Sequence, residues 1–245
     1  MSATAYIRCR AVAKSFHGKA VLRGVDLDVH PGETLVILGG SGSGKSVLLK
    51  HMNGLLRPEG GEVEVDGQAL GALDEDGLVG VRRKVGMLFQ MSALFDSLTV
   101  GENVAYALHE HRVCPPADVP ARVRRALEMV DLPGTEVLMP AELSGGMRKR
   151  AALARALVLE PRALLYDEPT TGLDPVVAAK INHLIRDLQR RLGLTSVVVT
   201  HDLASAFLVG DRIAFLHEGR IRFAGSIEEA RRTTDPFLHE FLTAA

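Results

Sequence analysis

The stretch LVILGGSGSGKSVLLKHMNG, residues 35–54, restricts the possible folds of this chain more than any other part of its sequence. An apolar run predicts a short buried strand, a Gly/Ser run follows it, and an apolar-periodic segment after that predicts a helix. Between the strand and the helix lies the pattern G-x-x-x-x-G-K-S, which consists of Gly39, Gly44, Lys45 and Ser46. A strand before the pattern and a helix after it are the context that a phosphate-binding loop requires.

The residue types in this loop suit the binding of a nucleoside triphosphate. Glycines allow backbone conformations that a Cβ disfavours, so successive N–H groups can point at one anion, and the following helix adds a positive N-terminal end. Lys45 would reach the β- and γ-phosphates, and the Ser46 hydroxyl would ligate Mg²⁺. A flexible Gly/Ser turn is the alternative, and the flanking strand and helix disfavour it.

Composition excludes several other classes of protein. Of the 245 residues, 47% are hydrophobic, so the chain can bury a sizeable core and is not disordered. The formal net charge of −1 gives no overall attraction to nucleic acid, and no nucleic-acid partner is expected. The basic runs at 122–125 and 147–150 are expected to be solvated helix faces.

Features of the termini and of the cysteines indicate where such a chain works. Its 2 cysteines indicate a reducing compartment and no metal cluster. No signal pattern begins the sequence, and no apolar run approaches the roughly 20 residues that span a bilayer. We therefore expect a soluble, cytoplasmic chain.

Buried strands alternate with long helical segments, and this alternation predicts an α/β fold with a parallel core sheet. Alternating strands near the N-terminus predict a small antiparallel β-subdomain around the strand that leads into the phosphate loop. The helix-rich interval 95–159 predicts an α-helical subdomain inserted into a single domain, 1–245. The rest of that domain, 1–94 and 160–245, together forms the core and the β-subdomain. The expected strands are 6–12, 25–29, 35–38, 62–66, 85–89, 163–166, 196–200, 212–216 and 220–224.

Carboxylates and a histidine follow two of the buried strands. The strand ALLY ends in Asp167 and Glu168, and the strand SVVVT is followed by His201. Because parallel strands end at the same sheet edge, we expect these residues beside the phosphate loop. Asp167 is placed to hold Mg²⁺ through waters, Glu168 to polarise a water in line with the γ-phosphate, and His201 to contact that phosphate or water. Loop capping by the carboxylates and a structural role for the histidine are the alternatives.

A second glycine-rich segment, LSGGM, begins a helix predicted to run through Arg155. Ser144 as N-cap, followed by Gly145 and Gly146, leaves free N–H groups at a positive helix end. That arrangement is a second anion site, although the phosphate loop already surrounds its own phosphates. We therefore expect it to serve a nucleotide bound by another subunit, and an ordinary helix cap is the alternative.

These segments together resemble the ATP-binding cassette (ABC) ATPases over essentially the whole chain. The phosphate loop matches the Walker A motif, and residues 164–168 match the Walker B motif. Gln90 matches the Q-loop, LSGGM the signature motif, 172–174 the D-loop, and His201 the switch histidine. The resemblance implies a P-loop NTPase fold of the ABC ATPase type that binds ATP and Mg²⁺. The nucleotide-binding residues that it implies are Phe16, which stacks on adenine, Gly39, Gly40, Ser41, Gly42, Ser43, Gly44, Lys45, Ser46, Val47, Ser144, Gly145, Gly146, Met147 and Asp174.

The same resemblance implies a head-to-tail dimer of two copies of the chain with two ATP molecules between them. Each ATP would lie between the phosphate loop of one copy and the LSGGM segment of the other, and Asp174 would bridge the two sites. The family most often has Gln where this chain has Met147, which should alter contact with the partner's nucleotide without removing the Ser/Gly cradle. The implied catalytic residues are Glu168 as base, His201 as γ-phosphate sensor, Lys45 and Gln90. The implied metal ligands are Ser46, Gln90 and Asp167.

More narrowly, the segment MLFQMSALF and the signature helix resemble the ATPases of Mla-type phospholipid transporters. This resemblance implies ATP hydrolysis that moves phospholipid between the inner and outer membranes of a diderm bacterium, from the cytoplasmic face of the inner membrane. The expected partners are an Mce-domain protein, a small cytoplasmic accessory subunit and an integral membrane permease. The permease would dock near Gln90–Phe95, with Met91, Leu94 and Phe95 as candidate contacts; packing within the helical subdomain is the alternative for each.

Other members of the superfamily remain as alternatives. An importer ATPase for a small polar solute such as an amino acid shares every catalytic motif. A DNA-repair or chromosome-structure ATPase needs a long heptad insertion, and a translation-type protein carries two cassettes; neither pattern occurs here. A non-hydrolysing binder is expected to lack Glu168 or His201. The sequence ends soon after DPFLHEFL, whereas some relatives continue with a tail that grips the other subunit, so we expect a dimer that depends on ATP or on the permease.

Overall fold

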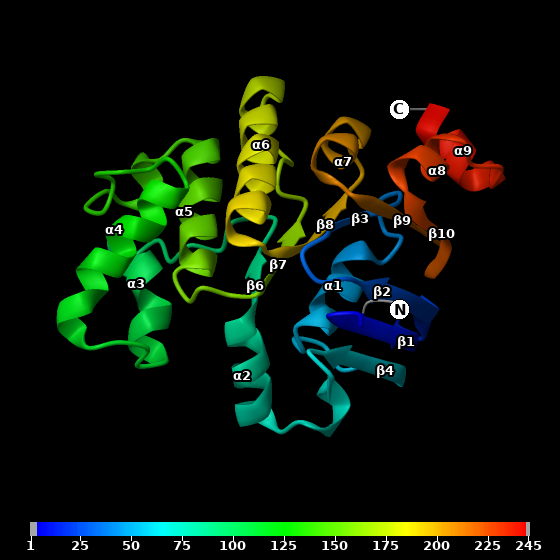
Figure 1. Cartoon of the computed structure of the whole chain (residues 1–245), viewed down its shortest axis with the longest axis horizontal. Helices are drawn as coiled ribbons and strands as arrows, with labels where there is room; N and C mark the ends of the chain where they lie inside the picture. The colour runs from blue at the N-terminus through cyan, green and yellow to red at the C-terminus, as the bar shows by residue number, and fades with distance from the viewer. Residues whose placement is uncertain (1–3, 244–245) are drawn as a thin grey trace.

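Two β-sheets organise the computed structural model, which describes residues 4–243 (Figure 1). The strands are β1 (Ile7–Phe16), β2 (Lys19–Val29), β3 (Thr34–Leu38), β4 (Gly60–Val65), β5 (Gln68–Ala69), β6 (Val85–Leu88), β7 (Ala163–Asp167), β8 (Thr195–Thr200), β9 (Arg212–His217) and β10 (Arg220–Ser226). The smaller sheet is antiparallel, with the order β2-β1-β4-β5. The larger sheet has the order β10-β9-β3-β8-β7-β6 and is parallel except for β10. The predicted α/β fold with a parallel core sheet is confirmed.

The smaller sheet forms because its strands alternate apolar and polar residues. In β1, Ile7 and Cys9 are fully buried, whereas Arg10 is exposed. His17 and Gly18, at φ 49° and 78°, make the tight turn into β2, where left-handed residues match the twist of an antiparallel pair.

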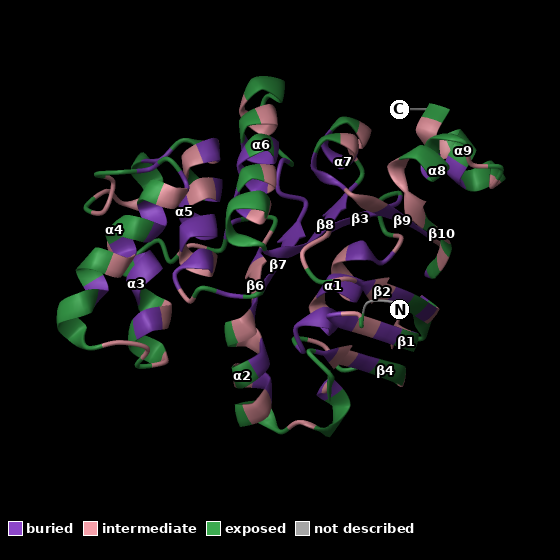
Figure 2. Ribbon diagram, viewed as in Figure 1, coloured by how far each residue is buried: buried purple, intermediate pink, exposed green. Residues whose placement is uncertain are grey.

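The larger sheet is apolar on both faces, as a covered parallel sheet must be. Every residue of β3, β7 and β8 is buried. Alternate side chains of β3 enter two separate cores: Val36 and Leu38 pack with one cluster, and Leu35 and Ile37 pack with the other. Figure 2 shows the buried strands running between the two covering layers.

Helices cover both faces of the larger sheet (Figure 1). They are α1 (Lys45–Met52), α2 (Glu75–Lys84), α3 (Val100–Glu110), α4 (Val119–Met129), α5 (Gly145–Leu157), α6 (Pro175–Leu192), α7 (Leu203–Val209), α8 (Ile227–Arg231) and α9 (Pro236–Thr243). The core that holds Val36 also contains buried residues of α3 to α9, whereas the core that holds Leu35 contains those of α1, α2 and the smaller sheet. Helices α3, α4 and α5 pack on one another at one end of the molecule. The boundaries 95–159 of the helical subdomain stay a prediction.

The structure corrects two expectations about the elements. Strand β3 pairs with β8 and β9 in the larger sheet, so the N-terminal antiparallel strands do not surround it. The reason is that β3 is apolar on both faces and needs a covered parallel environment. Helices α2, α8 and α9 lie in segments for which no element was expected.

Candidate nucleotide-binding site

The loop between β3 and α1 has the backbone that its glycines predict. Gly42 and Gly44 have φ 74° and 105°, in the left-handed region that favours glycine. At Gly39, an added Cβ would lie 2.3 Å from the carbonyl oxygen of Leu216 on β9. The Lys45 ammonium lies across the loop and donates to the Gly39 carbonyl at 2.9 Å. The loop and its lysine thus form one preorganised unit at the start of α1.

Two residues from distant parts of the chain meet beside this loop and suit a magnesium ion. The Ser46 hydroxyl on α1 donates to the Asp167 carboxylate at the end of β7, at 2.6 Å. Nearby in the loop, the buried Ser43 hydroxyl has no partner among the described residues. Within residues 4–243, no group of three or more His, Cys, Asp or Glu side chains could hold a metal by itself. Mg²⁺ commonly takes one or two carboxylates plus phosphate oxygens, so Ser46 and Asp167 fit an ion that is shared with a bound phosphate.

Glu168 is the point on which three polar side chains converge. It is 8% exposed and has φ 46°, which is unusual for a residue with a side chain. The His201 Nδ1 atom lies 3.1 Å and 3.0 Å from its two carboxylate oxygens, and the Thr171 hydroxyl donates to it at 3.2 Å. The Lys45 ammonium lies 3.5 Å away. A carboxylate held in this way, beside a phosphate loop, is placed to accept a proton from a water.

The cavity at this site has a volume of about 610 Å³. It brings together the loop and the residues predicted from the ends of β6, β7 and β8. Its lining is Gly40, Ser41, Gly42, Lys45, Ser46, Gln90, Glu168, His201 and Phe241. Asp167 joins this group through its hydrogen bond with Ser46.

Sequence reasoning missed two residues of this site. Phe241, on α9, lines the cavity and packs on Phe215 with 5.4 Å between ring centroids. Lys149 belongs to a basic run that was expected to be a solvated helix face, but it is only 5% exposed. Burial lowers the pKa of Lys149, although the carboxylates of Asp167 and Glu168 oppose that shift. No local pattern marks either residue, because both reach the site only through tertiary packing.

The predicted signature segment does not line this cavity. Ser144 caps α5, accepting from the Met147 backbone N–H at 3.3 Å. An added Cβ at Gly146 would lie 2.6 Å from Val177 on α6, so this glycine is also required for close packing of the two helices. Met147 is partly buried against the core, and Gly145 begins α5. Within one chain the segment therefore stands apart from the phosphate loop.

Phe16 and Asp174 are also among the predicted residues that do not line the cavity. Phe16 ends β1, is 39% exposed, and has the Lys14 ammonium 5.6 Å from its ring centroid. Asp174 caps α6 by accepting from the Val176 and Val177 backbone N–H groups, each at 3.0 Å. Their roles toward adenine and toward a second subunit stay predictions.

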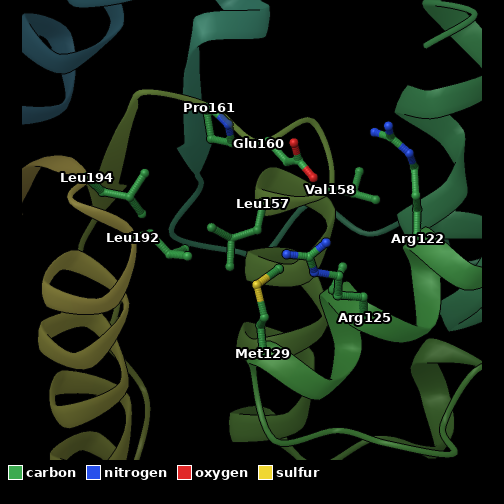
Figure 3. Close-up of a pocket in the computed structure, with 10 residues that line it drawn as sticks. Arg122, Arg125, Met129, Leu157, Val158, Glu160, Pro161, Leu192 and Leu194 are labelled. Atoms are coloured by element: carbon green, nitrogen blue, oxygen red, sulfur yellow. The ribbon is translucent and has the colours of Figure 1, made fainter. Parts of the chain in front are cut away.

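A separate hollow of about 430 Å³ lies where α4, α5 and α6 meet (Figure 3). It contains none of the residues predicted for nucleotide binding, and its basic side chains are Arg122 and Arg125. Helices α5 and α6 both end beside it and present their negative carbonyl ends. Cationic side chains are favourable beside the C-terminal ends of helices, so these two arginines suit the hollow without a ligand.

Fold and site together define a P-loop nucleotide-binding protein. Comparison with known families makes this assignment narrower, because the family profile described as ABC transporter matches residues 22–171. The chain belongs to the ABC transporter family, and it is an ATP-binding subunit of that family. Within residues 4–243, no helix combines the length and the apolar character needed to cross a membrane.

Named relatives of the chain serve different transport systems. It is 39% identical over 233 residues to the intermembrane phospholipid transport system ATP-binding protein MlaF of Escherichia coli (strain K12). That alignment covers 95% of this chain and 87% of MlaF. It is 40% identical over 256 residues to protein TRIGALACTOSYLDIACYLGLYCEROL 3, chloroplastic, of Arabidopsis thaliana. That alignment covers 98% of this chain and 74% of the relative. It is 42% identical over 244 residues to the sulfate/thiosulfate import ATP-binding protein CysA of Xylella fastidiosa (strain 9a5c). That alignment covers 97% of this chain and 68% of CysA. Such similar identities do not single out one cargo.

A solved structure supports the fold over most of the chain. The dimeric structure of MJ0796, a bacterial ABC transporter cassette, matches with a TM-score of 0.83 at 35% identity. The match covers 90% of this chain and 98% of that one. The fold of the phosphate loop, the sheet and the helical layer is therefore that of a known ABC cassette.

Proposed function

We propose that this chain binds ATP in the cavity beside Lys45 and hydrolyses it to drive phospholipid transport through a separate permease. The proposal of hydrolysis rests on one observation, which is that Lys45, His201 and Thr171 converge on the Glu168 carboxylate. A buried carboxylate at the mouth of a phosphate loop is the group that a phosphate-directed water needs as its base.

Each residue of the cavity has a distinct proposed role. Glu168 accepts the proton of the attacking water, and His201, within hydrogen-bond distance of that carboxylate, fixes its orientation and contacts the γ-phosphate. The Lys45 ammonium has three N–H donors, so it can hold the Gly39 carbonyl and a phosphate oxygen together. Ser46, Asp167 and the Gln90 amide would hold Mg²⁺, which neutralises phosphate charge when bound.

A second copy of the chain completes the proposed site. The Ser144–Gly146 segment lies apart from the cavity of its own chain, so its free N–H groups are available to the nucleotide of a partner. The dimeric arrangement of the MJ0796 cassette, at 35% identity, supports this proposal. In the proposed dimer, closure around ATP would be the step that drives the permease.

The proposed permease-docking surface is the segment from Gln90 to Phe95. Met91 is 86% exposed and Phe95 is 43% exposed, whereas Leu94 packs partly against the core. Exposed large apolar side chains next to a cavity residue suit an apolar helix from a membrane partner. The chain would then work at the cytoplasmic face of the inner membrane, with an Mce-domain protein and a small accessory subunit in the same complex.

Affinity purification of the tagged chain from solubilised membranes tests the phospholipid proposal. We expect an integral permease, an Mce-domain protein and bound phospholipid to be recovered with it. A Met91→Glu variant serves as the control, because a charge at the most exposed apolar position should release the permease without touching the ATP cavity. Recovery of a substrate-binding-protein importer would contradict the phospholipid assignment and leave ATP hydrolysis intact.

The second candidate is the ATPase of an importer for a small polar solute. The 42% identity to the CysA protein favours it about as strongly as the MlaF identity favours phospholipid. The resemblance of the segment around Gln90 to the Mla-type ATPases is what places phospholipid first. The same purification distinguishes the two candidates by the partner that it recovers.

A further inference from the structure

Helix α5 places a buried cation behind the nucleotide cavity. Lys149 lies one turn beyond Ser144 on this helix and is 5% exposed, whereas its neighbours Arg148 and Arg150 reach solvent. A buried ammonium loses its hydration and must find acceptors within the protein. Lys149 finds these acceptors in two other elements of the chain.

The acceptors of Lys149 are two backbone carbonyls. Its Nζ atom donates to the carbonyl of Gln90, two residues after β6, and it lies 3.5 Å from the carbonyl of Glu168, directly after β7. Both acceptors belong to residues whose side chains line the cavity. One side chain thus joins the signature helix to the Q-loop and to the end of the Walker B strand.

The backbone at both acceptor segments is strained, which makes such support necessary. Glu168 has φ 46°, and Ser92 and Ala93 in the Q-loop turn have φ 63° and 51°. A second cation of α5, Arg155, donates to the Ser92 carbonyl at 3.0 Å and to the Ala93 carbonyl at 2.7 Å. Conformations of this kind persist only where surrounding contacts over-determine them, and here α5 supplies those contacts.

We propose that Lys149 is a positioning residue for ATP hydrolysis, which fixes the Gln90 and Glu168 backbone from the signature helix. This inference rests on the proposed roles of Gln90 and Glu168 in the reaction. A carbonyl cannot rotate without turning the peptide plane, so loss of the ammonium would let both side chains leave their places in the cavity. Within residues 4–243, no hydrogen bond joins Lys149 to the phosphate loop, so nucleotide binding should persist.

The test compares Lys149→Met with Arg150→Met. Methionine keeps most of the aliphatic stem of lysine and its helix propensity but removes the ammonium. Arg150 is the next residue on α5, and its guanidinium donates to the Asp131 carbonyl at 3.0 Å, away from the cavity. Both variants are measured for steady-state phosphate release and for equilibrium binding of a fluorescent ATP analogue, with thermal melting as the check of folding.

We expect Lys149→Met to lower kcat by at least about tenfold while the Kd for nucleotide changes by less than about threefold. Arg150→Met should stay within about twofold of the wild type in both quantities. Lys149→Arg should recover most of the lost kcat, because a guanidinium restores cationic donors at the same position. If the Met variant does not fold, Lys149→Gln keeps an amide donor without the charge. It should lower kcat by about threefold and leave the Kd for nucleotide nearly unchanged.

Three outcomes separate this inference from the proposed function. A folded Lys149→Met chain with wild-type kcat overturns the positioning role. An equal loss in nucleotide affinity and in kcat also overturns it, because that pattern indicates general damage to the site. A wild-type chain that binds but does not hydrolyse ATP would instead remove the proposed function itself.

Discussion

Glu168 shows at the scale of one residue how tertiary contacts define a reactive group. Its place after an apolar strand predicts a carboxylate at the sheet edge, but only the folded chain surrounds it with His201, Thr171 and Lys45. The Glu168 backbone leaves the extended conformation at φ 46°, and Glu168 lines the cavity. The sequence therefore predicts which residue is present, and the fold decides what it contacts.

Glu168→Gln separates ATP binding from hydrolysis. The amide keeps the size of the side chain and can still contact His201 and Thr171, but it cannot accept the proton of a water. We expect kcat to fall by at least about 10²-fold, with nucleotide affinity retained and ATP-bound dimers accumulating. Phosphate release and light scattering with ATP measure the two effects. Wild-type turnover in this variant would remove Glu168 from the role of base.

At the scale of elements, helix α9 contributes an unpredicted wall to the nucleotide cavity. It is anchored to the β9–β10 hairpin by an ion pair of Asp235 with Arg222 at 3.1 Å, and the Arg222 guanidinium lies 4.5 Å from the centre of the Phe237 ring. Leu238 is fully buried, and the Phe241 ring packs on Phe215 beside the cavity. A helix far from the motifs in sequence therefore bounds the site.

Phe241→Ala should weaken nucleotide binding. An aromatic wall contact is worth about 1 kcal/mol, so the Kd for the ATP analogue should rise by about fivefold. Phe207→Ala is the matched control, since that ring packs against the same core and under Arg231, outside the cavity. Unchanged or tighter binding in Phe241→Ala would mean that the ring is not a supporting wall.

Element boundaries show why part of the fold escaped prediction. Helix α2 was not predicted because it contains two glycines and only a short apolar pattern. Its helix signals are Asp74 as N-cap and three basic residues in its last turn. Strands β3, β7 and β8 were predicted nearly to their ends, because a covered parallel strand is a continuous apolar run. The pairing of β3 with β8 and β9 could not be predicted from β3 alone, since pairing depends on distant segments.

At the scale of the whole molecule, the two proposed halves of the nucleotide site do not meet within one chain. The phosphate loop lies in the cavity, whereas Ser144 caps a helix outside it. A symmetric dimer can bring the two halves together in pairs. In such a dimer, an intact half on one copy can pair with an intact half on the other copy, even when each copy carries one defective half.

Mixing two inactive variants tests this complementation. Lys45→Ala removes the phosphate-loop ammonium, and Ser144→Asp keeps a good N-cap for α5 while placing a negative charge against the partner's triphosphate. Each variant alone should be inactive, and an equal mixture should regain about a quarter of wild-type turnover, because half of random dimers carry one intact site of two. The double variant mixed with either single one should restore nothing. Failure of the productive mixture would contradict a shared site.

By itself the sequence determined the phosphate loop, the order of the core strands along the chain and the chemical identity of Ser46, Asp167, Glu168 and His201. These follow from local patterns, because a glycine run permits the positive φ angles of the loop and an apolar run favours a buried strand. Only the tertiary structure decided that Lys149 is buried behind the cavity and that Phe241 lines it. Neither carries a local signal, since burial and contact depend on what packs against a residue, and that is set by segments distant in sequence.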